Sequence, residues 1–289
     1  MKAAFAFVLN LDAELELERG VRYQPTKEII ARVEGLARAM RPGLPPASVV
    51  LDPLGEAAPP DAQPIAWCPT TRALRSIRAA GLSVPRVPDL TVLTRVNARP
   101  FAFELAPDEL AGALLVRDVD AARAALERPG EWLLKRCFGV SGRGQRRVRG
   151  GQVSAADTSF VAASIENDGA LVIEPRVVIT RELSVHAWIA GGTTHVRSIR
   201  EQTTDAHGAF VRSDHVRDLE ASIREPLVDG AVRVGEALIA AGYEGPFGVD
   251  AYLHRGPGDA PLSLRTLSEI NARYCMGWDD VDGWLAPTR

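Results

Sequence analysis

The alternation of apolar and polar positions predicts a small α/β lobe over residues 1–85. A strand near 3–11 is followed by a helix from Thr26 to Met40, and a second helix runs from Thr70 or Thr71 to about Ala80. Threonine is a residue type that caps helix N-termini, and an apolar face with helical period follows each of these caps. Short strands near 48–51 and 65–67 complete the expected lobe.

A Pro-punctuated connector at 84–88 marks the first expected boundary, and it divides the lobe from a middle stretch (86–175) and a last stretch (176–289). Few, long helices among many strands favour an α+β fold over a doubly wound sheet. The predicted elements are a helix at 119–127, strands at 132–138, 145–149, 171–179, 183–189 and 195–201, a polar loop at 202–214, a helix at 226–241, and strands at 247–254 and 263–270.

Composition narrows the class of protein. Of 289 residues, 46% are hydrophobic and 25% charged, which is typical of a folded globular chain. The net charge of -3 gives no overall attraction to nucleic acid or an anionic membrane, and the basic run 143–149 lacks the interleaved aromatic residues that stack on bases. No apolar stretch approaches the ~18–20 residues that span a bilayer. Three scattered cysteines fit a reducing compartment, so a cytoplasmic location is expected.

A lysine and a glycine-rich turn stand close together in the middle stretch. Lys135 lies at the end of an apolar strand, and the turn 139–144 reads Gly-Val-Ser-Gly-Arg-Gly. Glycines permit positive φ and let backbone N–H groups approach phosphate oxygens, so this pair is suited to phosphate binding. The spacing fits neither a P-loop nor a dinucleotide fingerprint. Taken alone, a solvated β-turn with flanking basic residues explains such a turn more often.

Oxygen ligands recur about 115 residues later. Glu269 and Asn271 are two positions apart on one predicted strand, so both side chains leave the same face, and Asp250 on a neighbouring antiparallel strand can converge with them. Two carboxylates and one amide suit Mg²⁺ better than Zn²⁺ or Ca²⁺. A salt-bridged pair of edge strands would account for the same residues about equally well.

The order of these motifs resembles the ATP-grasp superfamily, over roughly residues 84–273. In chain order the motifs are Lys135 with its glycine-rich loop, an acidic hinge strand at Glu174, the segment Arg181-Glu182-Leu183-Ser184-Val185, the segment Gly248-Val249-Asp250, and the segment Glu269-Ile270-Asn271-Ala272-Arg273. The resemblance implies two α+β lobes (86–175 and 176–289) that clasp ATP, preceded by an α/β pre-grasp lobe (1–85).

The resemblance also implies a role for each matching residue. ATP would be bound by Lys135, by the mobile loop Ser141, Gly142, Arg143 and Gly144, by the adenine-binding hinge Glu174, Pro175, Arg176 and Val177, and by Glu182 on the ribose. Asp250, Glu269 and Asn271 would hold one or two Mg²⁺ ions, for which Mn²⁺ can substitute. Arg273, joined by Arg200, would contact the transferred phosphate or the acyl intermediate. Pro175 has no N–H, which removes one donor from the hinge.

The reaction implied is ligation: ATP phosphorylates a small-molecule or peptide carboxylate, and an amine or similar nucleophile displaces phosphate. Two alternatives stay open, an ATP-grasp kinase that stops at a stable phosphorylated product and a non-catalytic ATP-binding protein. The residues do not identify the carboxylate, the nucleophile or the oligomeric state, although a homodimer is the commonest closed assembly. A second basic residue, usual in the family before the lysine, has no clear match; Arg117 is one candidate.

Overall fold

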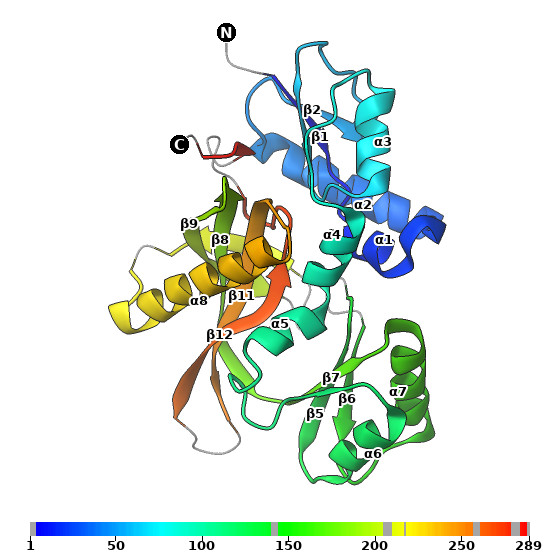
Figure 1. The fold of residues 1–289 in the computed structure, drawn as a ribbon, viewed down its shortest axis with the longest axis vertical. Helices are drawn as coiled ribbons and strands as arrows, with labels where there is room; N and C mark the ends of the chain where they lie inside the picture. The colour runs from blue at the N-terminus through cyan, green and yellow to red at the C-terminus, as the bar shows by residue number, and fades with distance from the viewer. Residues whose placement is uncertain are drawn as a thin grey trace.

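The computed structural model describes residues 4–139, 144–204, 210–216, 218–256, 261–278 and 284–287. These residues form three sheets with helices packed on them, an α+β architecture that confirms the predicted fold class (Figure 1). Each sheet belongs to a different part of the chain, so the molecule has an N-terminal, a middle and a C-terminal lobe.

The N-terminal lobe has a parallel sheet in the order β2-β1-β3. Thr26 and Thr70 cap α2 and α3, accepting hydrogen bonds from the amides of Ile29 and Ala73, as predicted. The short helix α1 was not predicted, because its leucines alternate with glutamates and hide the helical period. The elements are β1 (Phe5–Val8), α1 (Ala13–Arg19), η1 (Gly20–Arg22), α2 (Lys27–Met40), η2 (Arg41–Gly43), β2 (Val49–Asp52), β3 (Gln63–Ala66) and α3 (Thr71–Ala79).

The middle lobe has an antiparallel sheet in the order β4-β7-β5-β6, with α6 and α7 on one of its faces. Two helices that precede this sheet in the chain, α4 and α5, pack against strand β12 of the C-terminal lobe, and α5 also contacts β7 of the middle sheet. The elements are α4 (Leu90–Asn97), α5 (Arg99–Leu105), β4 (Leu114–Val116), α6 (Val119–Glu127), β5 (Glu131–Arg136), β6 (Gln145–Arg149), α7 (Ala155–Asp168) and β7 (Leu171–Pro175).

The C-terminal lobe has an antiparallel sheet in the order β10-β9-β8-β11-β12, with α8 across one face. The loop predicted at 202–214 was wrong in part, because β9 continues to Thr204 and pairs with β10. Helix α8 begins five residues before Pro226, where a start at the proline was predicted. The elements are β8 (Val178–Ala190), β9 (Thr193–Thr204), β10 (Phe210–His215), α8 (Ala221–Ala240), β11 (Gly245–Arg255) and β12 (Leu262–Asn271).

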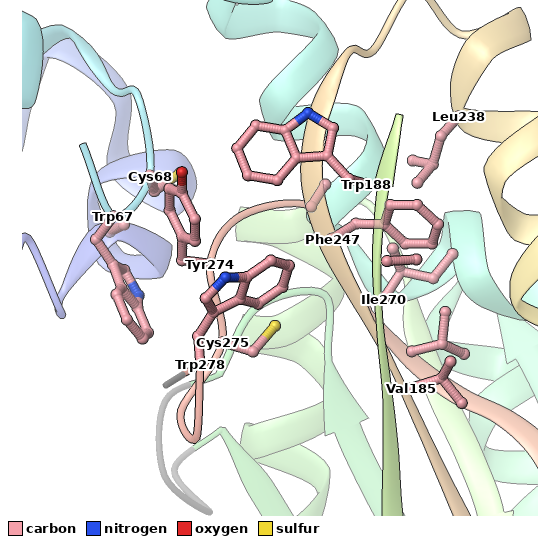
Figure 2. Packing of buried hydrophobic residues seen from close by; sticks show 14 of the residues in the cluster. Trp67, Cys68, Val185, Trp188, Leu238, Phe247, Ile270, Tyr274, Cys275 and Trp278 are labelled. Atoms are coloured by element: carbon pink, nitrogen blue, oxygen red, sulfur yellow. The ribbon is translucent and has the colours of Figure 1, made fainter. Parts of the chain in front are cut away.

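The N-terminal and C-terminal lobes share one hydrophobic core, the middle lobe has its own, and a third, smaller cluster lies within the N-terminal lobe. Phe7 of β1 meets Trp284 near the C-terminus edge to face, with ring centroids 4.9 Å apart. The amide of Tyr274 donates to the carbonyl of Trp67 at 3.1 Å, and Figure 2 shows Tyr274 between Trp67 and Trp188. The two outer lobes therefore form one packing unit, and the middle lobe is a second.

All three cysteines are buried and unpaired. Burial raises the pKa of the Cys137 thiol to about 11 and that of the Cys275 thiol to about 12, and it raises the pKa of Cys68 as well. Among the described helices, none combines the length and apolar character that crossing a bilayer requires.

Candidate active site

Two rows of side chains cross the face of the C-terminal sheet that α8 does not cover. Residues directly opposite one another on antiparallel strands point to the same face. The first row runs Arg200, Ser184, Asp250 and Glu269 across β9, β8, β11 and β12; the second runs Gln202, Glu182, Tyr252 and Arg265 across the same strands. Four residues predicted from sequence, Glu182, Arg200, Asp250 and Glu269, thus lie on one face.

The three predicted metal ligands converge at one end of these rows. Asn271 donates from Nδ2 to Oδ2 of Asp250 at 2.9 Å, and Asp250 stands opposite Glu269. Burial, with the negative charge of Glu269 adding to it, raises the pKa of Asp250 to about 6. Two acids held this close favour a cation between them.

Arginines compensate these acids in the structure. Arg99 donates from Nη2 to both oxygens of Glu269, at 3.1 and 3.3 Å, and Arg273 donates to Oδ1 of Asn271 at 2.8 Å. The described residues contain no group of three or more His, Cys, Asp or Glu side chains that could hold a metal ion. The donor set still fits Mg²⁺, which takes few protein ligands and fills its remaining positions with water and phosphate oxygens.

On the middle lobe, Lys135 and Glu174 face the same way. Lys135 of β5 lies diagonally from Glu174 of β7, on the sheet face opposite α6 and α7, and Nζ of Lys135 is 2.6 Å from Oε2 of Glu174. Burial alone would raise the pKa of the Glu174 carboxyl, but the charges of Lys135 and Arg265 outweigh it and lower that pKa to about 2. The lysine predicted to bind phosphate is therefore held by a buried carboxylate.

The predicted glycine-rich loop is described only at its ends, because Ser141, Gly142 and Arg143 lie outside the described residues. Gly144 accepts a hydrogen bond from the Arg136 amide at 2.9 Å and has a φ of 76°. A Cβ at this position would lie 2.8 Å from the carbonyl oxygen of Phe138, so the turn requires glycine here.

The predicted hinge has fewer backbone amides available for adenine than its sequence suggests. β7 ends at Pro175, which has no N–H, and the amide of Arg176 already donates to the carbonyl of Glu131 at 2.8 Å. Of the hinge residues predicted to read adenine, Val177 is then the first whose amide is not committed to a backbone bond of the middle sheet.

The two predicted catalytic arginines lie in different surroundings. Arg273 donates to Glu14 of α1 and to the carbonyl of Tyr274, so an N-terminal side chain reaches the end of β12. Arg200 is buried and donates from Nε to Oγ of Ser213 at 3.2 Å and from Nη2 to the Ser213 carbonyl at 3.0 Å. Arg273 contacts the predicted metal ligand Asn271, whereas Ser184 of β8 stands between Arg200 and Asp250 in the row; the catalytic role of both arginines stays a prediction.

Four residues at the site were missed by sequence reasoning: Glu14, Arg99, Tyr252 and Arg265. Arg99 donates to the Arg136 carbonyl at 2.7 Å as well as to Glu269, so it links the strand of Lys135 to the acid group. Arg117, the candidate named from sequence, forms an exposed ion pair with Glu104. Arg265 lies four positions before Glu269, but the β11–β12 pairing shifts between the two, so their spacing alone did not place the Arg265 side chain.

Comparison with solved structures identifies the fold. D-cycloserine synthetase aligns with 98% of this chain and 96% of its own at 14% identity (TM-score 0.55). D-alanyl-alanine synthetase A from Vibrio cholerae aligns with 94% and 89% at 12% identity (TM-score 0.53). N5-carboxyaminoimidazole synthetase from Staphylococcus aureus, complexed with ADP, aligns with 95% and 71% at 12% identity (TM-score 0.50). No protein-family model and no curated protein matches the sequence.

The chain has the ATP-grasp fold, as the order of its motifs predicted. The similarity extends over nearly the whole chain, so the N-terminal lobe, the middle lobe and the C-terminal lobe are all included. At 12 to 14% identity these likenesses show the fold alone, and they do not identify the reaction.

Proposed function

We propose that this chain is an ATP-dependent ligase that activates a small-molecule or peptide carboxylate as an acyl phosphate for attack by an amine or similar nucleophile. The observation that supports it most is the arrangement of charge on the C-terminal sheet, where Arg200, Asp250 and Glu269 stand in one row. In the neighbouring row Arg265 reaches the Lys135–Glu174 pair of the middle lobe. A polyphosphate and a cation would find complementary groups on both lobes.

In this proposal the substrate carboxylate oxygen bonds to the γ-phosphorus of ATP as the bond to the β-phosphate oxygen breaks, which gives ADP and an acyl phosphate. Asp250, Glu269 and Asn271 would hold Mg²⁺, which neutralises charge on the phosphate oxygens. Lys135 would orient the phosphates. The nucleophile then bonds to the acyl carbon, phosphate leaves, and the amine proton passes to solvent. Arg273 and Arg200 would offset the charge on the tetrahedral oxygen.

A pocket of about 240 Å³ lies between α1, α2 and the ends of the glycine-rich loop, and it is a candidate space for one co-substrate. Its walls combine carboxylates, guanidinium groups and apolar side chains, so it would accept a small molecule that carries both charge and hydrocarbon. The lining residues that carry this argument are Asp12, Glu18, Arg136, Leu15, Ile29 and Phe138.

The first test is a thermal denaturation series with ATP, with and without Mg²⁺. Ligand at 100 times its Kd stabilises the folded state by about 2.7 kcal/mol. We expect a Mg²⁺-dependent stabilisation that Glu269→Ala abolishes and that Glu201→Ala, in a half-exposed ion pair with Arg181, leaves intact. The absence of any shift at millimolar ATP would contradict ATP binding itself.

A second assay separates a ligase from a kinase. A ligase releases ADP only when both the carboxylate and the nucleophile are present, or else forms an acyl phosphate that hydroxylamine traps. A kinase instead accumulates a stable phosphorylated product with one acceptor. ATP binding without any ADP release across a broad panel of acceptors would support the non-catalytic alternative.

A further inference from the structure

Arg265 of β12 is fully engaged inside the protein, with 4% of its surface exposed. Its guanidinium donates from Nε to the Leu267 carbonyl at 2.9 Å, from Nη1 to the Tyr252 hydroxyl at 2.8 Å and from Nη2 to Oε1 of Glu174 at 2.9 Å. Two of these acceptors belong to the C-terminal sheet and the third to the middle sheet. Arg265 therefore ties the two lobes together at a fixed place.

An irregularity in β12 aims Arg265 in this direction. The pairing of β11 with β12 shifts between Asp250 and Tyr252, which brings Arg265 opposite Tyr252. Leu267 lies at this shift, and both of its backbone polar groups have hydrogen-bond partners. The Leu267 amide donates to Glu109 at 2.7 Å, and the Leu267 carbonyl accepts from Arg265. A bulge that re-aims a side chain toward a site is a recurrent use of such irregularities.

The Glu174 carboxylate is shared between two cations. One oxygen pairs with Lys135 at 2.6 Å and the other with Arg265 at 2.9 Å. Two positive charges and one negative charge leave the group with a net charge of +1. If Arg265 were neutral, Glu174 would cancel the charge of Lys135, and little positive potential would remain for a phosphate.

We propose that Arg265 is a positioning residue for ATP. By pairing with one carboxylate oxygen of Glu174, Arg265 keeps the other oxygen in place for Lys135 and leaves the positive charge of Lys135 available to the polyphosphate. This inference rests on the proposed function, because it takes Lys135 as the phosphate ligand. Arg265 itself touches no reacting atom. Arg265 affects ATP binding through the Glu174 carboxylate, and variants of Glu174 separate this effect from a purely structural role of Arg265.

The test measures binding of a non-hydrolysable ATP analogue with Mg²⁺ to the full chain by calorimetry, for the wild type and for Arg265→Gln, Glu174→Gln and the double variant. We expect Arg265→Gln to weaken binding about tenfold or more, the size of one charge-assisted hydrogen bond. In the double variant Lys135 faces a neutral amide and the net charge returns to +1, so affinity should recover most of that loss. A purely structural arginine would make the double variant no better than the single one.

Arg181→Gln is the matched control, since Arg181 also forms a two-point ion pair, with Glu201, and its side chain leaves the other face of β8. If Arg265→Gln does not fold, the comparison of the double variant with the wild type decides, because both have a net charge of +1 at this group: an affinity within threefold of the wild type supports action through Glu174, and a larger loss overturns it. Unchanged affinity in Arg265→Gln, or no recovery in the double variant, also overturns the inference. Failure of the wild type to bind the analogue would refute the proposed function and this inference together.

Discussion

Acid should weaken this protein through Glu174, the carboxylate between Lys135 and Arg265. Its pKa is lowered from 4.5 to about 2, so the folded state holds this carboxylate ionised more strongly than the unfolded state does. A depressed pKa contributes stability that is fully present above the unfolded pKa and is lost as pH falls toward the folded one. The shift corresponds to on the order of 3 kcal/mol at neutral pH.

About 2 kcal/mol of this contribution should disappear between pH 5 and pH 3, because linkage concentrates the loss between the two pKa values. Glu174→Gln removes the titrating group and leaves two buried cations without their anion, so it should be less stable than the wild type at neutral pH by about 3 to 5 kcal/mol. Its stability should then fall less than that of the wild type on acidification.

Urea denaturation of the wild type and of Glu174→Gln at pH 5 and pH 3 gives, for each protein, the loss in free energy of unfolding between the two pH values. The wild type should lose about 2 kcal/mol more than Glu174→Gln over this interval. Equal losses in the two proteins would show that the carboxylate is not held ionised by its neighbours, and the argument for a shared buried charge would fail with it.

Two further predictions concern packing. Leu134→Ala, at a fully buried position of the middle core, should cost about 2 to 5 kcal/mol; hydrogen exchange should accelerate in middle-lobe peptides and hardly change in β1 or α8, whereas uniform acceleration would contradict a separate core in the middle lobe. Gly248→Ala would place a Cβ 2.4 Å from the Cys275 sulfur and should cost about 1 to 3 kcal/mol. Adding Cys275→Ala should restore most of that loss in thermal denaturation, and no restoration would refute the clash.

Local chemistry made several elements predictable. Helix α6 spans Val119–Glu127, as expected, because Asp118 caps it by accepting from the Ala121 amide at 2.7 Å. The convergence of Asp250 with Glu269 followed from the period of two along strands, which needs only pairing between neighbours in the chain. An element can be predicted from the sequence where one short-range signal, such as a helix cap or the period of a strand, determines it.

The remainder depends on contacts that no short window contains. Arg99 and Glu269 are 170 positions apart, and Glu14 and Arg273 are 259 apart, so neither pair can be inferred from local spacing. Arg265 reaches Glu174 only because the β12 pairing shifts and because two lobes meet there. Strand β10 was taken for a loop because its polar residues form an edge, where alternation carries little information.

The three buried thiols give this protein a practical property. A thiolate is the form that reacts with maleimides and disulfides, and the raised pKa values of Cys137 and Cys275 keep that form scarce at neutral pH. The native chain should therefore be almost silent to thiol labels while folded. One new cysteine on α7 and another on α8 would carry a fluorescent pair without removing a native residue, and the distance between the dyes would report directly whether nucleotide draws the middle lobe toward the rest of the molecule.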